Sequence, residues 1–195
     1  MKTPAAILIG MVLVAATGCG VVGSASIERE AGWLTAAEVP VVRQKGEADC
    51  GAAALAMVLS SLSRPVTLEE IIAACPGSEP GIRAADLRDV ARREGLKAFV
   101  IAGTVDDLER ELGKHRPILV GLVKGEGQRR TCHYEVVVGL NLERCQVALL
   151  DPARGWRRDD LDRFASEWRP AGQLALVVFR AADGDSGVDA SAVPR

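Results

Sequence analysis

The chain has 195 residues and a mass of 20.6 kDa, which fits one domain with a short appendage at each end. Apolar residues make up 48% and charged residues 26% of it, values that exclude a wholly disordered, a collagenous or a multi-span membrane protein. The formal net charge is −2 and aromatic residues make up 4%, so the chain lacks the charge and the stacking surfaces that bind nucleic acid. We therefore expect no nucleic-acid partner.

Residues 1–18 have the pattern of a signal peptide. Lys2 precedes an apolar run from Ala5 to Ala16, which is too short to span a bilayer permanently. The next residues, Ala16-Thr17-Gly18-Cys19, resemble a bacterial lipobox, although Ala16 stands where Leu is usual. This resemblance implies that Cys19 is acylated and anchors the mature chain to a membrane. The alternative is an ordinary signal peptide cleaved at small residues. Both predict an extracytoplasmic domain.

The composition of the remaining chain predicts three parts. Residues 19–38 are expected to be a tether, residues 39–180 the folded domain and residues 181–195 a disordered tail, because that tail is small, polar and without a pattern.

Helices are predicted in the first half of the domain. Val39–Gln44 is expected to be extended and to lead into a polar turn. Cys50–Leu62 is apolar all round, which is typical of a buried central helix. Thr67 and Glu70 have the spacing of a capping box at the start of a second helix, and Ile82–Arg93 is the third.

Strands are predicted in the second half. They cover Lys97–Ile101, Ile118–Val123, His133–Leu140, Cys145–Leu150 and Leu174–Phe179, and short helices are expected at Asp106–Leu112 and near residues 160–168. Asn141–Arg144 is expected to join two of these strands as a hairpin. Helices followed by antiparallel strands indicate the α+β class.

Four residues have the chemistry of nucleophilic catalysis. Cys50 begins the buried helix, where free peptide N–H groups favour a thiolate. His133 opens one strand of the predicted hairpin and Asp151 ends the other, so the two side chains are expected to be neighbours. A thiol, a base and a group that orients the base form a catalytic set. Gln44 offers an amide that can stabilise an oxyanion.

Three segments are similar to the motifs of the bacteriocin-processing double-glycine peptidases. They are residues 44–51 with the Ala-rich helix that follows, residues 133–139 and residues 151–155, and the likeness extends from Val39 to Phe179. It implies a papain-like fold, with a helical layer around the buried helix packed on an antiparallel sheet. It also implies a cysteine endopeptidase without a cofactor that cuts leader peptides after a Gly-Gly pair.

The same resemblance assigns a role to each of the four residues. Cys50 is the implied nucleophile, His133 the general base and acid, Asp151 the residue that orients His133, and Gln44 the oxyanion donor. Glu135 departs from the family pattern, because an aliphatic residue is commoner after the His-Tyr pair. Members of the family often form a cytoplasmic domain of an exporter, whereas the signal here points outward. The expected partner is a peptide, glycine-rich at the cleavage site.

Two other functions remain open on the same fold. One is a catalytically silent peptide-binding module, and the other is a thiol acyltransferase or amidase. Cys132 lies next to His133 without a CxxC or paired-His spacing, so no metal is expected. Cys75, Cys132 and Cys145 are expected to be small core residues, with a disulfide between two of them as the alternative.

Overall fold

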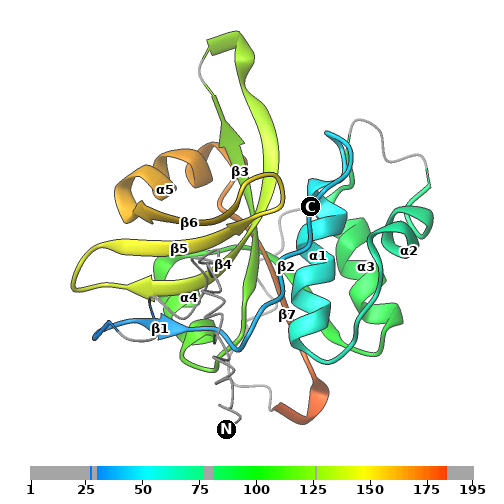
Figure 1. Cartoon of the computed structure of the whole chain (residues 1–195), viewed down its shortest axis with the longest axis horizontal. Coiled ribbons are helices and arrows are strands. Elements are labelled where there is room, and N and C mark those ends of the chain that lie inside the picture. The colour runs from blue at the N-terminus through cyan, green and yellow to red at the C-terminus, as the bar shows by residue number, and fades with distance from the viewer. Residues whose placement is uncertain (1–26, 28–29, 77–80, 126, 184–195) are drawn as a thin grey trace, which may run out of the picture.

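The structure is a computed structural model that describes residues 27, 30–76, 81–125 and 127–183 (Figure 1). Its helices and strands are, in chain order, β1 (Leu34–Thr35), α1 (Cys50–Ser61), α2 (Leu68–Ala73), α3 (Ala84–Arg93), β2 (Lys97–Ala102), α4 (Val105–Leu112), β3 (Ile118–Lys124), β4 (Thr131–Asn141), β5 (Gln146–Asp151), β6 (Gly155–Asp160), α5 (Leu161–Trp168) and β7 (Leu174–Phe179).

One antiparallel sheet forms the centre of the fold. Its strands lie in the order β2-β7-β3-β4-β5-β6, and β1 pairs with the far end of β4. Helices α1, α2 and α3 gather on one side of the sheet, and α5 lies on the other (Figure 1). The predicted α+β class, with a helical layer against a C-terminal antiparallel sheet, is confirmed.

The sheet separates two hydrophobic cores. Side chains alternate along a strand, so Val136 and Val138 of β4 pack with the α1 core, whereas Val137 packs with Phe164 and Trp168 of α5. Burying both faces explains why the central strands are almost continuously apolar.

Helix α1 is buried along most of its length, as its composition predicts. Every residue from Cys50 to Leu59 is buried, and the small Ala side chains let the helix approach the sheet closely. Gly51 makes the closest approach, since a Cβ built there would lie 3.1 Å from Cδ2 of Tyr134 in β4. This packing fixes the first residue of α1 against the first half of β4.

Other local predictions have mixed outcomes. The capping box of Thr67 and Glu70 is confirmed at the start of α2. Val39–Gln44 has no strand pairing, so the expected extended stretch is an irregular segment. Strand β6 was not predicted, because Gly155–Asp160 is largely charged and belongs to the edge of the sheet.

The folded domain begins earlier than the predicted boundary at residue 39. Ile27 is 1% exposed, Leu34–Thr35 pairs with β4, and Glu30 forms an ion pair of 2.8 Å with Arg158 of β6. These contacts are scattered over a stretch of mixed polar and apolar residues, so no periodic pattern reveals them. The predicted signal peptide, Cys19 and residues 184–195 of the predicted tail lie outside the described residues. Within the described part, none of the helices has the length and apolar character to cross a membrane.

The burial of Ile27 yields a stability prediction. Ile27→Ala should lower the free energy of unfolding by about 2–5 kcal/mol, because it leaves a cavity between the N-terminal segment and the sheet. Ile72, which is 38% exposed, provides the matched control. Ile72→Ala should change stability by no more than about 0.5 kcal/mol. Urea denaturation measures both, and equal effects would contradict the placement of Ile27.

Candidate active site

Cys50 is the first residue of α1 and is 6% exposed. The polar loop before it closes on itself, because the backbone N–H of Gly46 donates to Oδ2 of Asp49 at 2.7 Å. The predicted helix start at Cys50 is confirmed, and the thiol therefore lies where the helix dipole favours a negative charge.

The surroundings of the thiol favour its ionised form. Burial raises the pKa of Cys50, but hydrogen bonds from the His133 side chain and from the backbone N–H groups of Tyr134 and Gly51 outweigh it, so the pKa lies below its usual value. A thiolate, and not a thiol, is the reactive nucleophile.

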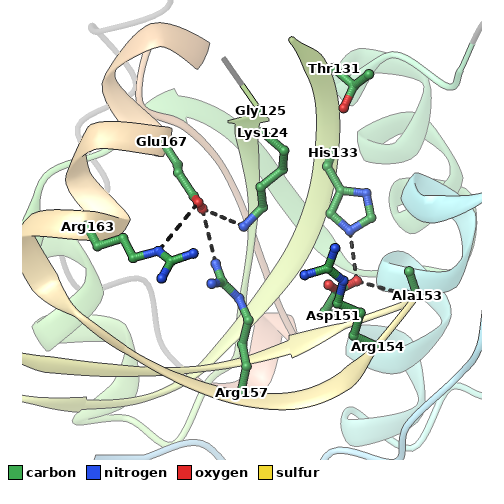
Figure 2. A pocket seen from close by; sticks show the side chains of 10 residues that line it. All are labelled: Lys124, Gly125, Thr131, His133, Asp151, Ala153, Arg154, Arg157, Arg163 and Glu167. Carbon is green, nitrogen blue, oxygen red and sulfur yellow. Dashed lines mark hydrogen bonds and ion pairs between the residues drawn. The ribbon is translucent and has the colours of Figure 1, made fainter. Parts of the chain in front are cut away.

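His133 and Asp151 meet as the hairpin predicts. Strands β4 and β5 pair antiparallel, and Nε2 of His133 lies 2.8 Å from Oδ1 of Asp151 (Figure 2). The backbone N–H of Ala153 also donates to this oxygen at 2.8 Å. Because Nε2 faces Asp151, Nδ1 is the ring nitrogen left for Cys50.

The pKa values of this pair move in opposite directions. Burial works against both charged forms, yet the hydrogen bonds and charges of Asp151 and Cys50 raise the pKa of His133 to about 9. The hydrogen bond and positive charge of His133, together with the backbone N–H groups of Ala153 and Arg154, lower the pKa of Asp151 to about 2. The arrangement therefore favours a thiolate, an imidazolium and a carboxylate in a row.

Gln44 lies in the loop before Cys50 and is tied to the turn after Asp151. Its backbone N–H donates to the carbonyl of Pro152 at 3.2 Å, while its side-chain Nε2 donates to the carbonyl of Gly46 at 2.9 Å. Its Oε1 is buried without a hydrogen-bond partner among the described residues. The predicted oxyanion role requires Nε2 to leave Gly46 and turn to the substrate.

Tyr134 is a site residue that the sequence reasoning did not single out. Its backbone N–H contributes to the low pKa of Cys50, and its ring packs on Gly51. Burial, and then the neighbouring Cys50 charge, raise the pKa of its phenol to about 12. Its position directly after His133 is the only signal that marks it in the sequence.

A polar cavity of about 310 Å³ opens beside His133 and Asp151, which we call the dyad (Figure 2). Its lining consists of Lys124, Gly125, Thr131, His133, Asp151, Ala153, Arg154, Arg157, Arg163 and Glu167. Glu135 is close to this cavity but does not line it. One possible metal-ligand atom from each of His133, Glu135 and Asp151 lies within 4.8 Å of the other two. A metal ion does not fit there, because Lys124 and Arg157 each approach a Glu135 oxygen at 2.8 Å.

The remaining cysteines differ in burial. Cys75 is buried, as expected of a core residue, but Cys132 and Cys145 are exposed, so the expectation that these two belong to the core is wrong. Cys132 is the second residue of β4 and Cys145 lies in the β4–β5 turn, and neither side chain belongs to the two hydrophobic cores. The described residues form no disulfide.

The His133–Asp151 contact yields a titration prediction. Asp151→Asn removes the carboxylate that stabilises the imidazolium, so the His133 pKa should fall from about 9 by more than one unit. The chain has only two histidines, and NMR of the ring nitrogens separates them. His115, whose Nδ1 lies 2.9 Å from the carbonyl of Thr35, is the internal reference. An unchanged His133 titration would mean that Asp151 does not act on it.

Comparison with known proteins identifies the family. The profile of the Peptidase C39 family matches residues 38–182. A double glycine motif protease from an AMS/PCAT transporter, solved with a leader peptide, is 26% identical with a TM-score of 0.59 over 74% of this chain and 93% of its own. The peptidase domain of Streptococcus ComA, from a bifunctional ABC transporter of a quorum-sensing pathway, is 26% identical with a TM-score of 0.63 over 73% and 99%.

A C39-like peptidase from Bacillus anthracis shares the fold, with 14% identity and a TM-score of 0.63 over 76% of this chain and 98% of its own. The search of curated proteins found no match. Because the family profile spans most of the chain and the fold agrees, the chain belongs to the Peptidase C39 family and is a cysteine peptidase.

Proposed function

We propose that this protein is an endopeptidase in which Cys50, His133 and Asp151 form the catalytic triad. The observation that carries the proposal is the continuous line of hydrogen bonds from Cys50 through His133 to Asp151, with the pKa of the thiol lowered and that of the imidazole raised to about 9. A thiol, a base and an orienting acid in this order are what acyl transfer through a thioester requires.

Each residue of the triad has one task in the reaction. The Cys50 thiolate attacks the peptide carbonyl, and His133 donates its proton to the departing amine, which leaves a thioester on Cys50. His133, now neutral, removes a proton from water, and the resulting hydroxide releases the carboxylic acid and restores the thiolate. Asp151 holds the ring so that one nitrogen faces Cys50 throughout.

The tetrahedral intermediate needs donors for its oxyanion. Backbone N–H groups at a helix start have no partner within the helix, so the N–H of Cys50 is one candidate donor. Gln44 is the second, once Nε2 exchanges the Gly46 carbonyl for the oxyanion. Its backbone contact with Pro152 keeps it beside the Asp151 turn during this exchange.

The proposed substrate is a peptide with a Gly-Gly pair before the cleaved bond. Support comes from the relatives at 26% identity, one described as a double glycine motif protease bound to a leader peptide. The sequence pattern up to Cys19 further supports an extracytoplasmic domain anchored to a bacterial membrane by an acylated Cys19.

Cleavage of a synthetic peptide with one internal Gly-Gly pair tests the proposal. The wild-type chain should give a product ending in Gly-Gly, and Cys50→Ala should give none. Cys132→Ala is the matched control, because Cys132 is also a thiol near His133 but is exposed, whereas Cys50 is buried. It should retain cleavage. Mass spectrometry of the products measures all three.

The alternative functions leave different results in the same assay. Equal binding of the peptide by wild type and Cys50→Ala, with no product from either, would contradict the proposal and indicate a binding module. Transfer of the acyl group to an added amine, with little free acid, would indicate a transferase.

Asp151→Asn should keep the fold but lower kcat by about 100-fold or more, through a misoriented imidazole.

A further inference from the structure

Glu135 is a buried acid that the proposed reaction does not use. It lies two residues after His133 on β4, so both side chains project from the same face of the strand. Its side chain is 0% exposed, and one carboxylate oxygen lies within 4.8 Å of a ring nitrogen of His133 and an oxygen of Asp151. A charge this close to the dyad acts on its protonation, because burial weakens screening by water.

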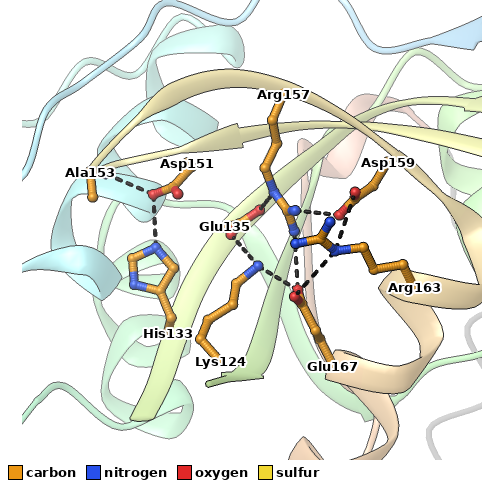
Figure 3. A network of polar contacts seen from close by, with 9 residues as sticks. All are labelled: Lys124, His133, Glu135, Asp151, Ala153, Arg157, Asp159, Arg163 and Glu167. Carbon is orange, nitrogen blue, oxygen red and sulfur yellow. Dashed lines mark hydrogen bonds and ion pairs between the residues drawn. The ribbon is translucent and has the colours of Figure 1, made fainter. Parts of the chain in front are cut away.

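Two cations hold Glu135 in place. Nζ of Lys124, from β3, lies 2.8 Å from Oε1, and Nε of Arg157, from β6, lies 2.8 Å from Oε2 (Figure 3). Both cations also contact Glu167 of α5, and Arg157 pairs with Asp159. The cluster therefore links three strands and one helix, and its core is the Glu135 carboxylate.

Stability alone is a poor explanation for this cluster. Burying a charged pair costs solvation energy, and apolar residues of similar size at such positions are often as stable or more stable. A buried acid with two cations beside the dyad instead indicates an electrostatic role.

We propose that Glu135 is a positioning residue that, with Lys124, sets the pH range over which the Cys50–His133 ion pair exists. This inference rests on the proposed function. The charged or titratable groups that face the pair are Cys50 of α1, Lys124 of β3, Tyr134 and Glu135 of β4, Asp151 of β5, Arg154 of the β5–β6 turn, Arg157 of β6, and Arg163 and Glu167 of α5.

The sign of the effect follows from charge. The negative charge of Glu135 stabilises protonated His133 and opposes formation of the Cys50 thiolate, so it raises both the pH at which the pair forms and the pH at which His133 loses its proton. Glu135→Gln removes that charge and keeps the shape, so both transitions should move to lower pH by about one unit. Lys124→Gln removes a positive charge from the same cluster, so both should move to higher pH.

The experiment measures both transitions without a substrate. The rate of Cys50 alkylation by iodoacetamide against pH, mapped by mass spectrometry, reports formation of the thiolate, and NMR of the His133 ring reports loss of its proton. Glu111→Gln is the matched control. Glu111 is also buried, at 2% exposure, and pairs with Arg116 at 3.2 Å and Lys114 at 3.8 Å in α4 and the turn after it. It should leave both transitions unchanged.

Opposite shifts in Glu135→Gln and Lys124→Gln support the inference. Unchanged transitions, or shifts in the same direction, would overturn it, since a purely structural role moves both variants alike. If Glu135→Gln fails to fold, Lys124→Gln decides alone, because Lys124 is 24% exposed and better tolerates substitution. An ordinary thiol in the wild-type chain would contradict the proposed function, whereas an activated wild-type thiol with unmoved variants contradicts only this inference.

Discussion

The candidate active site depends on how closely the start of α1 packs against β4. Gly51 brings the helix onto the ring of Tyr134, and this contact sets the Cys50 thiol beside the His133 side chain and the Tyr134 backbone. A larger residue at Gly51 would push the helix away, because a Cβ there meets Tyr134 at 3.1 Å and Leu87 at 3.2 Å. The helical layer thus carries Cys50 and the sheet carries His133 and Asp151, so the packing of the two layers brings the three side chains together.

Burial and charge oppose each other at this site. Burial disfavours every ionised form, yet the hydrogen bonds and opposite charges within the Cys50–His133–Asp151 row shift all three pKa values toward the charged forms. The backbone N–H of Ala153 fixes Asp151 at the end of the row. The buried carboxylate of Glu135, paired with Lys124 and Arg157, lies close to His133 and Asp151 and adds further charge beside the same imidazole.

The sequence predicts much of this arrangement, for identifiable reasons. The apolar run after Cys50 and the hairpin between His133 and Asp151 are local patterns, and they were sufficient to predict that those groups meet at one end of the fold. The side-chain partner of Gln44 and the burial of Ile27 depend on contacts between distant segments, which composition does not reveal. Strand β6 is charged because its Arg157 faces buried acids, so its sequence lacks the apolar alternation of a strand.

The central claim is that the fold makes Cys50 an activated nucleophile, and its alkylation rate against pH tests that most directly. Exposed Cys132 and Cys145 are reference thiols in the same chain. The account predicts that iodoacetamide labels Cys50 rapidly at about pH 6, well below an ordinary thiol pKa, and that His133→Ala slows this labelling. Slow labelling that rises only near the ordinary thiol pKa, and that His133→Ala leaves unchanged, would contradict it.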